Sequence, residues 1–277
     1  GLDPQDRSAL PQVTADPDDP NFAWALTRDG LFKTEDRGAH WQAVETDGLT
    51  VNDAQSRFFV DPNDGARLAI SPIDLDPNDV LPSILLLSEN RGITWRRIEI
   101  PGSFFESLAW EVGDRQTLYA VTSAGLQRSR DGGQTWQSLE SHLPNFGALS
   151  PLSSQVWSDP QRANALVVSL NNYGLYRSLD GGETFEALTT GPTGRHPTFF
   201  KVAFDPHRRD TFHAVGFAPE LSLGPTLWRW SEEGGLEPTS TASDPNIEAL
   251  AVDPTTVDRL YVGTREGAWR IDLAATP

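Results

Sequence analysis

The chain has 277 residues with no cysteine and no methionine, and its formal net charge of −17 gives a sequence isoelectric point of about 4.6. The lack of cysteine excludes disulfides and thiol chemistry, and the negative charge disfavours nucleic acid as a partner. No apolar run approaches the ~20 residues of a membrane-spanning helix, so no membrane span is expected. Gly1 is not an initiator residue, which fits removal of a leader, and we favour a secreted or periplasmic monomer.

Six segments of the chain start in the same way, with a short apolar strand that ends in an acidic turn, usually Asp-Pro. An aromatic or small residue follows eight positions after the acid, within the next strand. Successive acids are 45 to 50 residues apart, a period typical of propeller repeats with several short strands in each unit. The pairs are Asp16 and Trp24, Asp61 and Ala69, Glu111 and Tyr119, Asp159 and Val167, Asp205 and His213, and Asp253 and Tyr261.

A second pattern, Ser/Thr-x-Asp-x-Gly-x-x-Trp, follows the third strand of most units. It occurs at residues 34–41 and 129–136, at 88–95 with Asn90 in place of the acid, and at 178–185 with Phe185 in place of the tryptophan, and a degenerate copy lies at 228–234. Alternating strands flank each copy, so the pattern predicts a hairpin loop. We interpret its acid or amide as a structural group that accepts hydrogen bonds from N–H groups of the turn. These residues are Asp36, Asn90, Asp131 and Asp180.

The two patterns together predict an all-β, six-bladed propeller that forms a single domain over residues 1–277. The expected blades are approximately residues 12–50, 55–100, 105–141, 153–190, 199–240 and 247–273. The last blade lacks a fourth strand, which would leave an exposed edge. Residues 1–11 are assigned to no other blade, so we expect part of Leu2–Leu10 to pair with residues 268–273 and complete it.

The loop pattern resembles that of the BNR or Asp-box repeat propellers, a group that includes sialidases, sortilin-type receptor domains, xyloglucanase-like glycosidases and photosystem II assembly factors. The resemblance covers nearly the whole chain. It implies the propeller fold and a ligand site on the face opposite the Asp boxes. It implies no particular activity, because such propellers share the loop and differ at the site. The Phe-Arg-Ile-Pro segment and Tyr/Glu nucleophile pair of family sialidases are not evident in this sequence.

Polar residues are expected at the mouth of the central channel, on the face opposite the boxes, where most long connections emerge. The predicted ring consists of the residues that lie four positions before the inner-strand acids. They are Gln12, Arg57, Ser107, Gln155, Lys201 and Ala249. Arg28 and Arg265 lie in turns beside Arg57, so the three arginines form a candidate anion-binding patch. The alternative is that each arginine pairs with a nearby acid such as Asp29 or Glu266. Tyr173 lies in a loop of the same face and is a candidate sugar platform.

A glycoside hydrolase would need two carboxylates about 5 to 10 Å apart on this face. The candidates are Asp53, Glu106, Glu220 and Glu266, and no spacing among them singles out a pair. Two histidines in connecting loops, His142 and His196, are candidates for acid–base chemistry. No histidine pair has a metal-ligand spacing, so neither a metal nor a cofactor is expected.

Three functions remain open at the level of the sequence. We favour a non-catalytic recognition propeller that binds a glycan or a protein or peptide ligand at the channel mouth, through residues such as Arg57, Tyr173 and Lys201. The first alternative is a divergent glycoside hydrolase that uses two of the carboxylates. The second is an assembly factor for a larger complex, in which the acidic surface would dock on basic partner segments.

Overall fold

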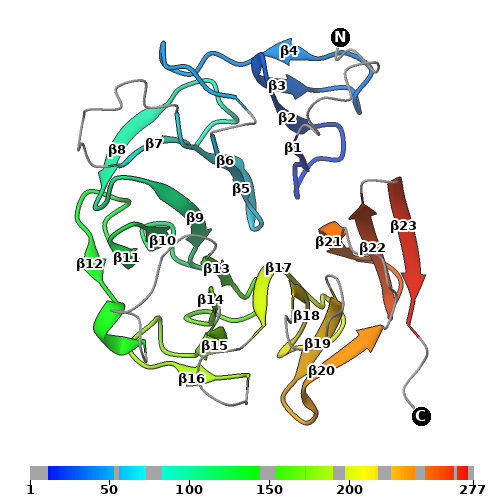
Figure 1. The fold of residues 1–277 in the computed structure, drawn as a ribbon. Coiled ribbons are helices and arrows are strands. Elements are labelled where there is room, and N and C mark those ends of the chain that lie inside the picture. Colours follow the sequence, from blue (N-terminus) through cyan, green and yellow to red (C-terminus); the bar gives the residue numbers. More distant parts are fainter. Residues whose placement is uncertain are drawn as a thin grey trace. The chain divides into compact units, whose positions relative to one another are not determined.

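Antiparallel strands make up nearly all the regular structure of this computed structural model, which describes residues 12–52, 56–72, 83–143, 154–171, 173–189, 197–217, 226–240, 247–264 and 267–273. The strands form six small sheets, in which neighbours in sequence are neighbours in the sheet. The fold is a six-bladed β-propeller, as the sequence predicts, and Figure 1 labels its strands in chain order. Contacts group the chain into two units, residues 1–138 and 139–277, with three sheets in each. We number the sheets as blades 1 to 6 in chain order.

Unit 1 contains blades 1 to 3, each with four described strands. Blade 1 consists of β1 (Gln12–Ala15), β2 (Ala23–Thr27), β3 (Gly30–Thr34) and β4 (Gln42–Ala43). Blade 2 consists of β5 (Phe58–Asp61), β6 (Asp64–Ile70), β7 (Ser83–Ser88) and β8 (Arg96–Ile100). Blade 3 consists of β9 (Phe105–Trp110), β10 (Leu118–Thr122), β11 (Gly125–Ser129) and β12 (Gln137–Ser138).

Unit 2 begins with a 3-10 turn (Glu140–His142) and contains blades 4 to 6. Blade 4 consists of β13 (Gln155–Ser158), β14 (Leu166–Leu170), β15 (Gly174–Ser178) and β16 (Glu186–Ala187). Blade 5 consists of β17 (Thr198–Phe204), β18 (Thr211–Phe217), β19 (Thr226–Ser231) and β20 (Gly235–Ser240). In the described residues blade 6 has three strands, β21 (Ile247–Val252), β22 (Arg259–Thr264) and β23 (Gly267–Asp272). The expected pairing of Leu2–Leu10 with this blade lies outside the described residues.

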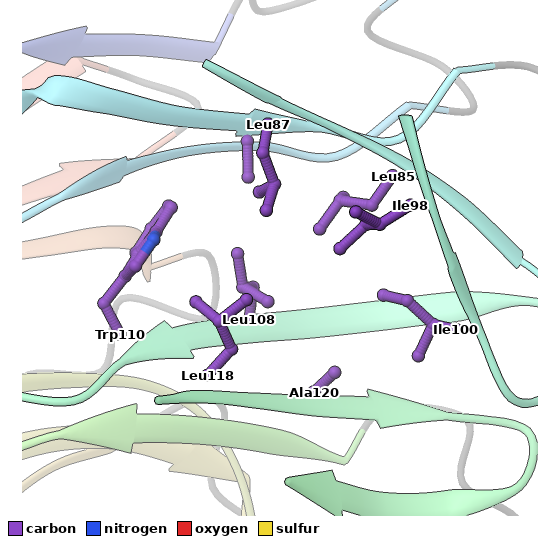
Figure 2. Close-up of a cluster of buried hydrophobic side chains, with 9 residues drawn as sticks. Leu85, Leu87, Ile98, Ile100, Leu108, Trp110, Leu118 and Ala120 are labelled. Atoms are coloured by element: carbon purple, nitrogen blue, oxygen red, sulfur yellow. The ribbon is translucent and has the colours of Figure 1, made fainter. Parts of the chain in front are cut away.

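The hydrophobic core lies between the faces of successive sheets. Figure 2 shows the cluster between blades 2 and 3, where side chains of β7 and β8 face those of β9 and β10. Its labelled members are Leu85, Leu87, Ile98, Ile100, Leu108, Trp110, Leu118 and Ala120. Equivalent clusters join blades 1 and 2, blades 4 and 5, and blades 5 and 6. Successive residues of a strand point to opposite faces of the sheet. A blade that follows one blade and precedes another can therefore pack against both.

In two blades a hydrogen bond joins the inner-strand acid to the residue eight positions later. The hydroxyl of Tyr119 on β10 donates to Oε2 of Glu111, which follows β9, at 2.9 Å in a buried site. In blade 6 the hydroxyl of Tyr261 donates to Oδ2 of Asp253 at 3.1 Å. Tyr261 nevertheless remains 43% exposed, whereas Tyr119 is buried.

In blade 5 a histidine takes the place of this tyrosine. His213 is buried, and its Nε2 lies 4.0 Å from Oδ2 of Asp205. Burial lowers the pKa of His213 to about 4, against the opposing effect of the Asp205 carboxylate. The imidazole is therefore neutral at neutral pH and packs in the core, which is the role expected from its register.

The Asp-box loops hold themselves together through their own side chains. In blade 3, Oδ1 of Asp131 accepts from the N–H groups of Gln134 and Thr135 at 2.9 and 2.8 Å, and Oδ2 accepts from the Thr135 hydroxyl at 2.6 Å. The Ser129 hydroxyl donates to the same carboxylate and accepts from the N–H of Gly133. These bonds to its ionised form lower the pKa of Asp131 to about 2.

Each of the four Asp-box loops is also fastened to the turn between the first two strands of its own blade or, in blade 2, to the start of β6. The residue after the acid or amide has a positive φ, and its N–H donates to a backbone carbonyl there. The pairs are Arg37 with Asn21, Arg91 with Ala66, Gly132 with Gln116, and Gly181 with Asn164. The boxes and the acidic turns therefore lie at the same end of each blade, which we call the box end. The opposite end, where the inner strands begin, is the mouth end.

Candidate functional site

At the box end of unit 1, charged side chains are paired between blades. Buried Asp16 of blade 1 accepts from Nε of Arg91 of blade 2 at 2.8 Å. Asp64 of blade 2 pairs with Arg115 of blade 3. These ion pairs join neighbouring sheets, so the charged side chains named here at the box end are already paired within the fold.

The box end of unit 2 has the same design. Arg162 of blade 4 donates to Oδ1 of Asp210 of blade 5 at 2.6 Å. Arg208 of blade 5 forms two parallel bonds, each of 2.7 Å, with Asp258 of blade 6. Such a bidentate pair is geometrically specific as well as strong. Cross-blade ion pairing at the box end is thus a repeated feature of the chain.

The predicted ring residues take equivalent positions at the mouth end of their blades. Each faces a residue of the second strand that lies fourteen positions later in the sequence. The pairs are Gln12 with Leu26, Arg57 with Ser71, Ser107 with Val121, Gln155 with Ser169, Lys201 with Val215, and Ala249 with Gly263. The register expected from the sequence is therefore present within each blade.

A β-bulge precedes the ring position in three of the six blades. In the ladders of β9, β17 and β21, pairing skips one residue, which is Glu106, Phe200 and Glu248 respectively. A bulge leaves its extra residue unpaired and re-aims the side chain. Phe200 and Glu248 are not among the site residues predicted from the sequence. Their position directly before a ring residue is the signal that would have found them.

Arg57 and Glu106 bring opposite charges to the mouth end of unit 1. Arg57 is exposed, directly before β5, and its guanidinium makes only a 3.5 Å contact with the Ser56 carbonyl oxygen. Glu106 is half-buried, and burial raises the pKa of its carboxyl, while the charge of Arg57 acts in the opposite direction. Within the described residues neither side chain forms an ion pair, with the other or with a third group. Both charges are therefore available to a ligand.

Polar contacts fix the loop that leads into the Glu106 bulge. The N–H of Ser103 donates to Oγ of Ser123 at 2.7 Å, and the Thr122 hydroxyl donates to the Pro101 carbonyl at 2.6 Å. Gly102 fits between them with a φ of +109°, and an added Cβ would lie 2.7 Å from Oγ of Ser123. The loop has no room for a side chain at this position, so the backbone before Glu106 is well determined.

A family model for the BNR/Asp-box repeat matches residues 127–138, which include the third and best copy of the loop. No curated protein sequence matches the chain. The repeat returns in blades 1, 2 and 4, where the acid or amide accepts the equivalent backbone hydrogen bond. The chain is thus a propeller that carries BNR/Asp-box repeats.

The solved structures similar to this propeller are of several kinds. The GH74 xyloglucanase from Xanthomonas campestris is 22% identical with a TM-score of 0.72, over 94% of this chain and 43% of the enzyme. YCF48 bound to D1 peptide is 16% identical with a TM-score of 0.59, over 96% of this chain and 78% of YCF48. The extracellular domain of BT4673 from B. thetaiotaomicron is 17% identical with a TM-score of 0.63, over 96% and 32% of the two chains. This chain spans less than half of the xyloglucanase, and identities this low establish the fold alone.

The structure places the other described candidates at different ends of their blades. Arg28 is exposed in the turn between β2 and β3, and Tyr173 is half-buried in the turn between β14 and β15, both at the mouth end. Lys201 is exposed at its ring position on β17. His142 instead has its Nδ1 2.8 Å from the carbonyl oxygen of Gly182, in the Asp box of blade 4. It contacts a box loop because the chain leaving β12 passes the next blade there, and not on the opposite face as expected.

The remaining candidates, Asp53, His196, Glu220, Arg265 and Glu266, lie outside the described residues. Among the residues that are described, no three His, Asp or Glu side chains are grouped so that they could hold a metal ion. Likewise, no helix in the described part of the chain is long and apolar enough to cross a membrane.

Proposed function

We propose that this chain is a non-catalytic recognition propeller that binds a glycan or a peptide ligand at its mouth end. One observation carries the proposal, the difference in charge pairing between the two ends of unit 1. At the box end, Asp16 and Asp64 are paired across blades. At the mouth end, Arg57 and Glu106 have no ion-pair partner in the described residues. Charges that do not serve the fold are the ones that a ligand can use.

The local structure supports binding without large rearrangement. The bulge at Glu106 is held by the loop around Gly102, and the ring register is shared by all the blades. A site built on strands and a fixed loop loses little conformational entropy when a ligand binds. In unit 1, Arg28 lies at the same mouth end as Arg57; in unit 2, Tyr173 and Lys201 lie at the mouth ends of blades 4 and 5.

The similar structures support a range of ligands. One is YCF48 bound to D1 peptide, which this chain matches over 78% of its length. Others are a xyloglucanase and the extracellular domain of BT4673, of which this chain covers smaller parts. A peptide or a glycan is accordingly the ligand class to test first, and the extracellular neighbours fit a secreted or periplasmic location.

Glycoside hydrolysis is the second candidate, and Glu106 is the residue that favours it. A half-buried carboxyl group with a raised pKa has the property required of a general acid, and burial has this effect on Glu106. The partner carboxylate would come from Asp53, Glu220 or Glu266. A role in assembling a larger complex is the third candidate, because the charge of −17 suits basic partner segments.

The proposal is tested by a glycan array and a peptide array, run beside a panel of chromogenic glycosides. We expect retention of at least one ligand class without turnover, and we expect Arg57→Ala to weaken retention. The matched control is Arg97→Ala, which removes an exposed arginine from the outer strand β8. Turnover of a glycoside that Glu106→Gln abolishes would replace recognition by hydrolysis.

A further inference from the structure

The mouth end carries the same pair of charges in both units. In unit 1, a basic ring residue on blade 2, Arg57, precedes a bulged acid on blade 3, Glu106. In unit 2, a basic ring residue on blade 5, Lys201, precedes a bulged acid on blade 6, Glu248. The members of each pair occupy the same register positions, and β17 contacts β21. A base on one blade followed by a bulged acid on the next is therefore a repeated construction.

In unit 1 the two charges are near each other but not joined. The charge of Arg57 is close enough to oppose the burial-driven rise in the pKa of Glu106. The two groups nevertheless form no ion pair, and in the described residues neither has an ion-pair partner elsewhere. A ligand with groups of both signs would complete both charge-assisted interactions at once.

Two aromatic side chains accompany this pair of charges. Phe59 lies two residues after Arg57 on β5, and Phe105 directly precedes Glu106 on β9. Their rings meet edge to face with centroids 5.7 Å apart, and both pack on the buried cluster between blades 2 and 3. Both remain partly exposed. They offer apolar surface for the stem of a long charged side chain.

We infer that Arg57, Glu106, Phe59 and Phe105 form a subsite for a peptide segment that carries one acidic and one basic group. The inference rests on the proposed function and specifies its ligand. The carboxylate of the peptide pairs with Arg57, and its ammonium or guanidinium group pairs with Glu106. The aliphatic stem of the basic side chain lies on the two phenylalanine rings.

The charges of the subsite argue against ligands of a single sign. A polyanion would gain from Arg57 but would meet Glu106 and the overall charge of −17. A polycation would gain from Glu106 but would leave Arg57 opposed by like charge. A neutral glycan would displace water from both charged groups. It would make hydrogen bonds to them in return but no ion pair with either one. A segment of mixed charge satisfies both groups.

Charge reversal provides the test, with an array of short peptides as the probe. The array contains acidic, basic, mixed-charge and neutral peptides, and a neutral glycan array runs in parallel. We expect the unaltered protein to retain mixed-charge peptides. Arg57→Glu should shift the preference to basic peptides, and Glu106→Arg should shift it to acidic peptides. Each single change should weaken mixed-charge binding about tenfold or more, as expected for loss of a charged hydrogen bond.

The double variant, Arg57→Glu with Glu106→Arg, restores one charge of each sign and should recover mixed-charge binding. Arg97→Glu with Glu99→Arg, on exposed positions of β8, is the matched control and should leave binding unchanged. Melting temperatures verify that every variant is folded. Glycan retention that depends on Arg57, with no mixed-charge peptide retained, would overturn the peptide inference and leave recognition standing. Retention of neither class would overturn both.

Discussion

The carboxylate of Asp131 makes its hydrogen bonds within its own loop, and these bonds lower its pKa to about 2. The ordinary value for an aspartate is about 3.9, so the folded state holds the ionised form more strongly than the unfolded state does. The stability that results is fully present above about pH 4 and is lost as the pH falls towards 2. We expect Asp131→Ala to lower the melting temperature at pH 7 and to have a smaller effect near pH 2.

Blade 2 supplies the matched control for this residue. Its loop uses Asn90, whose Oδ1 accepts from the N–H of Thr94 at 2.9 Å and whose Nδ2 donates to the Thr94 hydroxyl at 2.8 Å. The amide of Asn90 makes the same two contacts as the carboxylate of Asp131. The threonine hydroxyl donates to the carboxylate of Asp131 but accepts from the amide of Asn90. Asp131→Asn should therefore retain more stability than Asp131→Ala at pH 7. Equal melting temperatures for the two variants would show that these loop bonds contribute nothing.

The residue after the box acid has a positive φ, which penalises an arginine at that position. Arg37 has a φ of 62°, whereas glycine stands at the equivalent position in blades 3 and 4. A left-handed conformation costs a non-glycine residue about 1 to 2 kcal/mol, part of which glycine regains as flexibility in the unfolded chain. We expect Arg37→Gly to raise the free energy of unfolding by about 0.5 kcal/mol.

Arg91, with a φ of 55°, occupies the same conformation but holds buried Asp16. Arg91→Gly should therefore lower the free energy of unfolding by about 1 to 3 kcal/mol, since it leaves a buried carboxylate without its partner. Urea denaturation of both variants measures the contrast. Stabilisation by Arg91→Gly would mean that the pair with Asp16 does not support the fold.

At the scale of elements, the connection from β8 to β9 fixes the backbone before Glu106. Gly102 and Gly113 both have a positive φ, but an added Cβ meets nothing within 4 Å at Gly113 and three atoms within 3.0 Å at Gly102. Gly113→Ala should cost about 1 kcal/mol, the strain of the backbone alone. Gly102→Ala should cost more and should also weaken ligand retention, because the loop must move. Equal losses of stability and unchanged retention would show that this loop does not position the site.

The edge of blade 6 is the second feature at this scale. In the described residues β23 pairs only with β22, and most of its side chains are exposed. We predict that part of Leu2–Leu10 completes this blade, because an uncovered strand invites association. Deletion of residues 1–9 should then lower the melting temperature and promote oligomers in size-exclusion chromatography. A truncated protein with unchanged melting temperature and a monomeric profile would contradict that pairing.

At the scale of the whole molecule, the repeat is what the sequence predicts best. The six inner strands follow from the apolar segment, the acid that ends it and the residue eight positions later, and in blades 3 and 6 a hydrogen bond from a tyrosine to the acid fixes this spacing. The box loops follow from residues whose side chains bond within a few positions. Hydrogen bonds of this kind can be predicted from a short stretch of sequence, because both partners lie within it.

Other features escape the sequence because they depend on distant partners. The bulge at Glu106 inserts one residue into a ladder without disturbing the apolar pattern of β9. The pairing of Arg208 with Asp258 joins turns that are fifty residues apart and appears only when the two blades pack. His142 lies in a connection whose path depends on the next blade, so its contact with Gly182 could not be read from its neighbours.

The central claim is that the mouth end binds the ligand while the box end holds the blades together. Hydrogen–deuterium exchange with and without the best ligand from the arrays tests it most directly. We expect ligand to slow exchange in residues 56–58 and 102–107, around Arg57 and Glu106, and to leave residues 129–135 of the Asp box unchanged. Protection confined to the Asp-box loops, with no change around Arg57 and Glu106, would contradict the account.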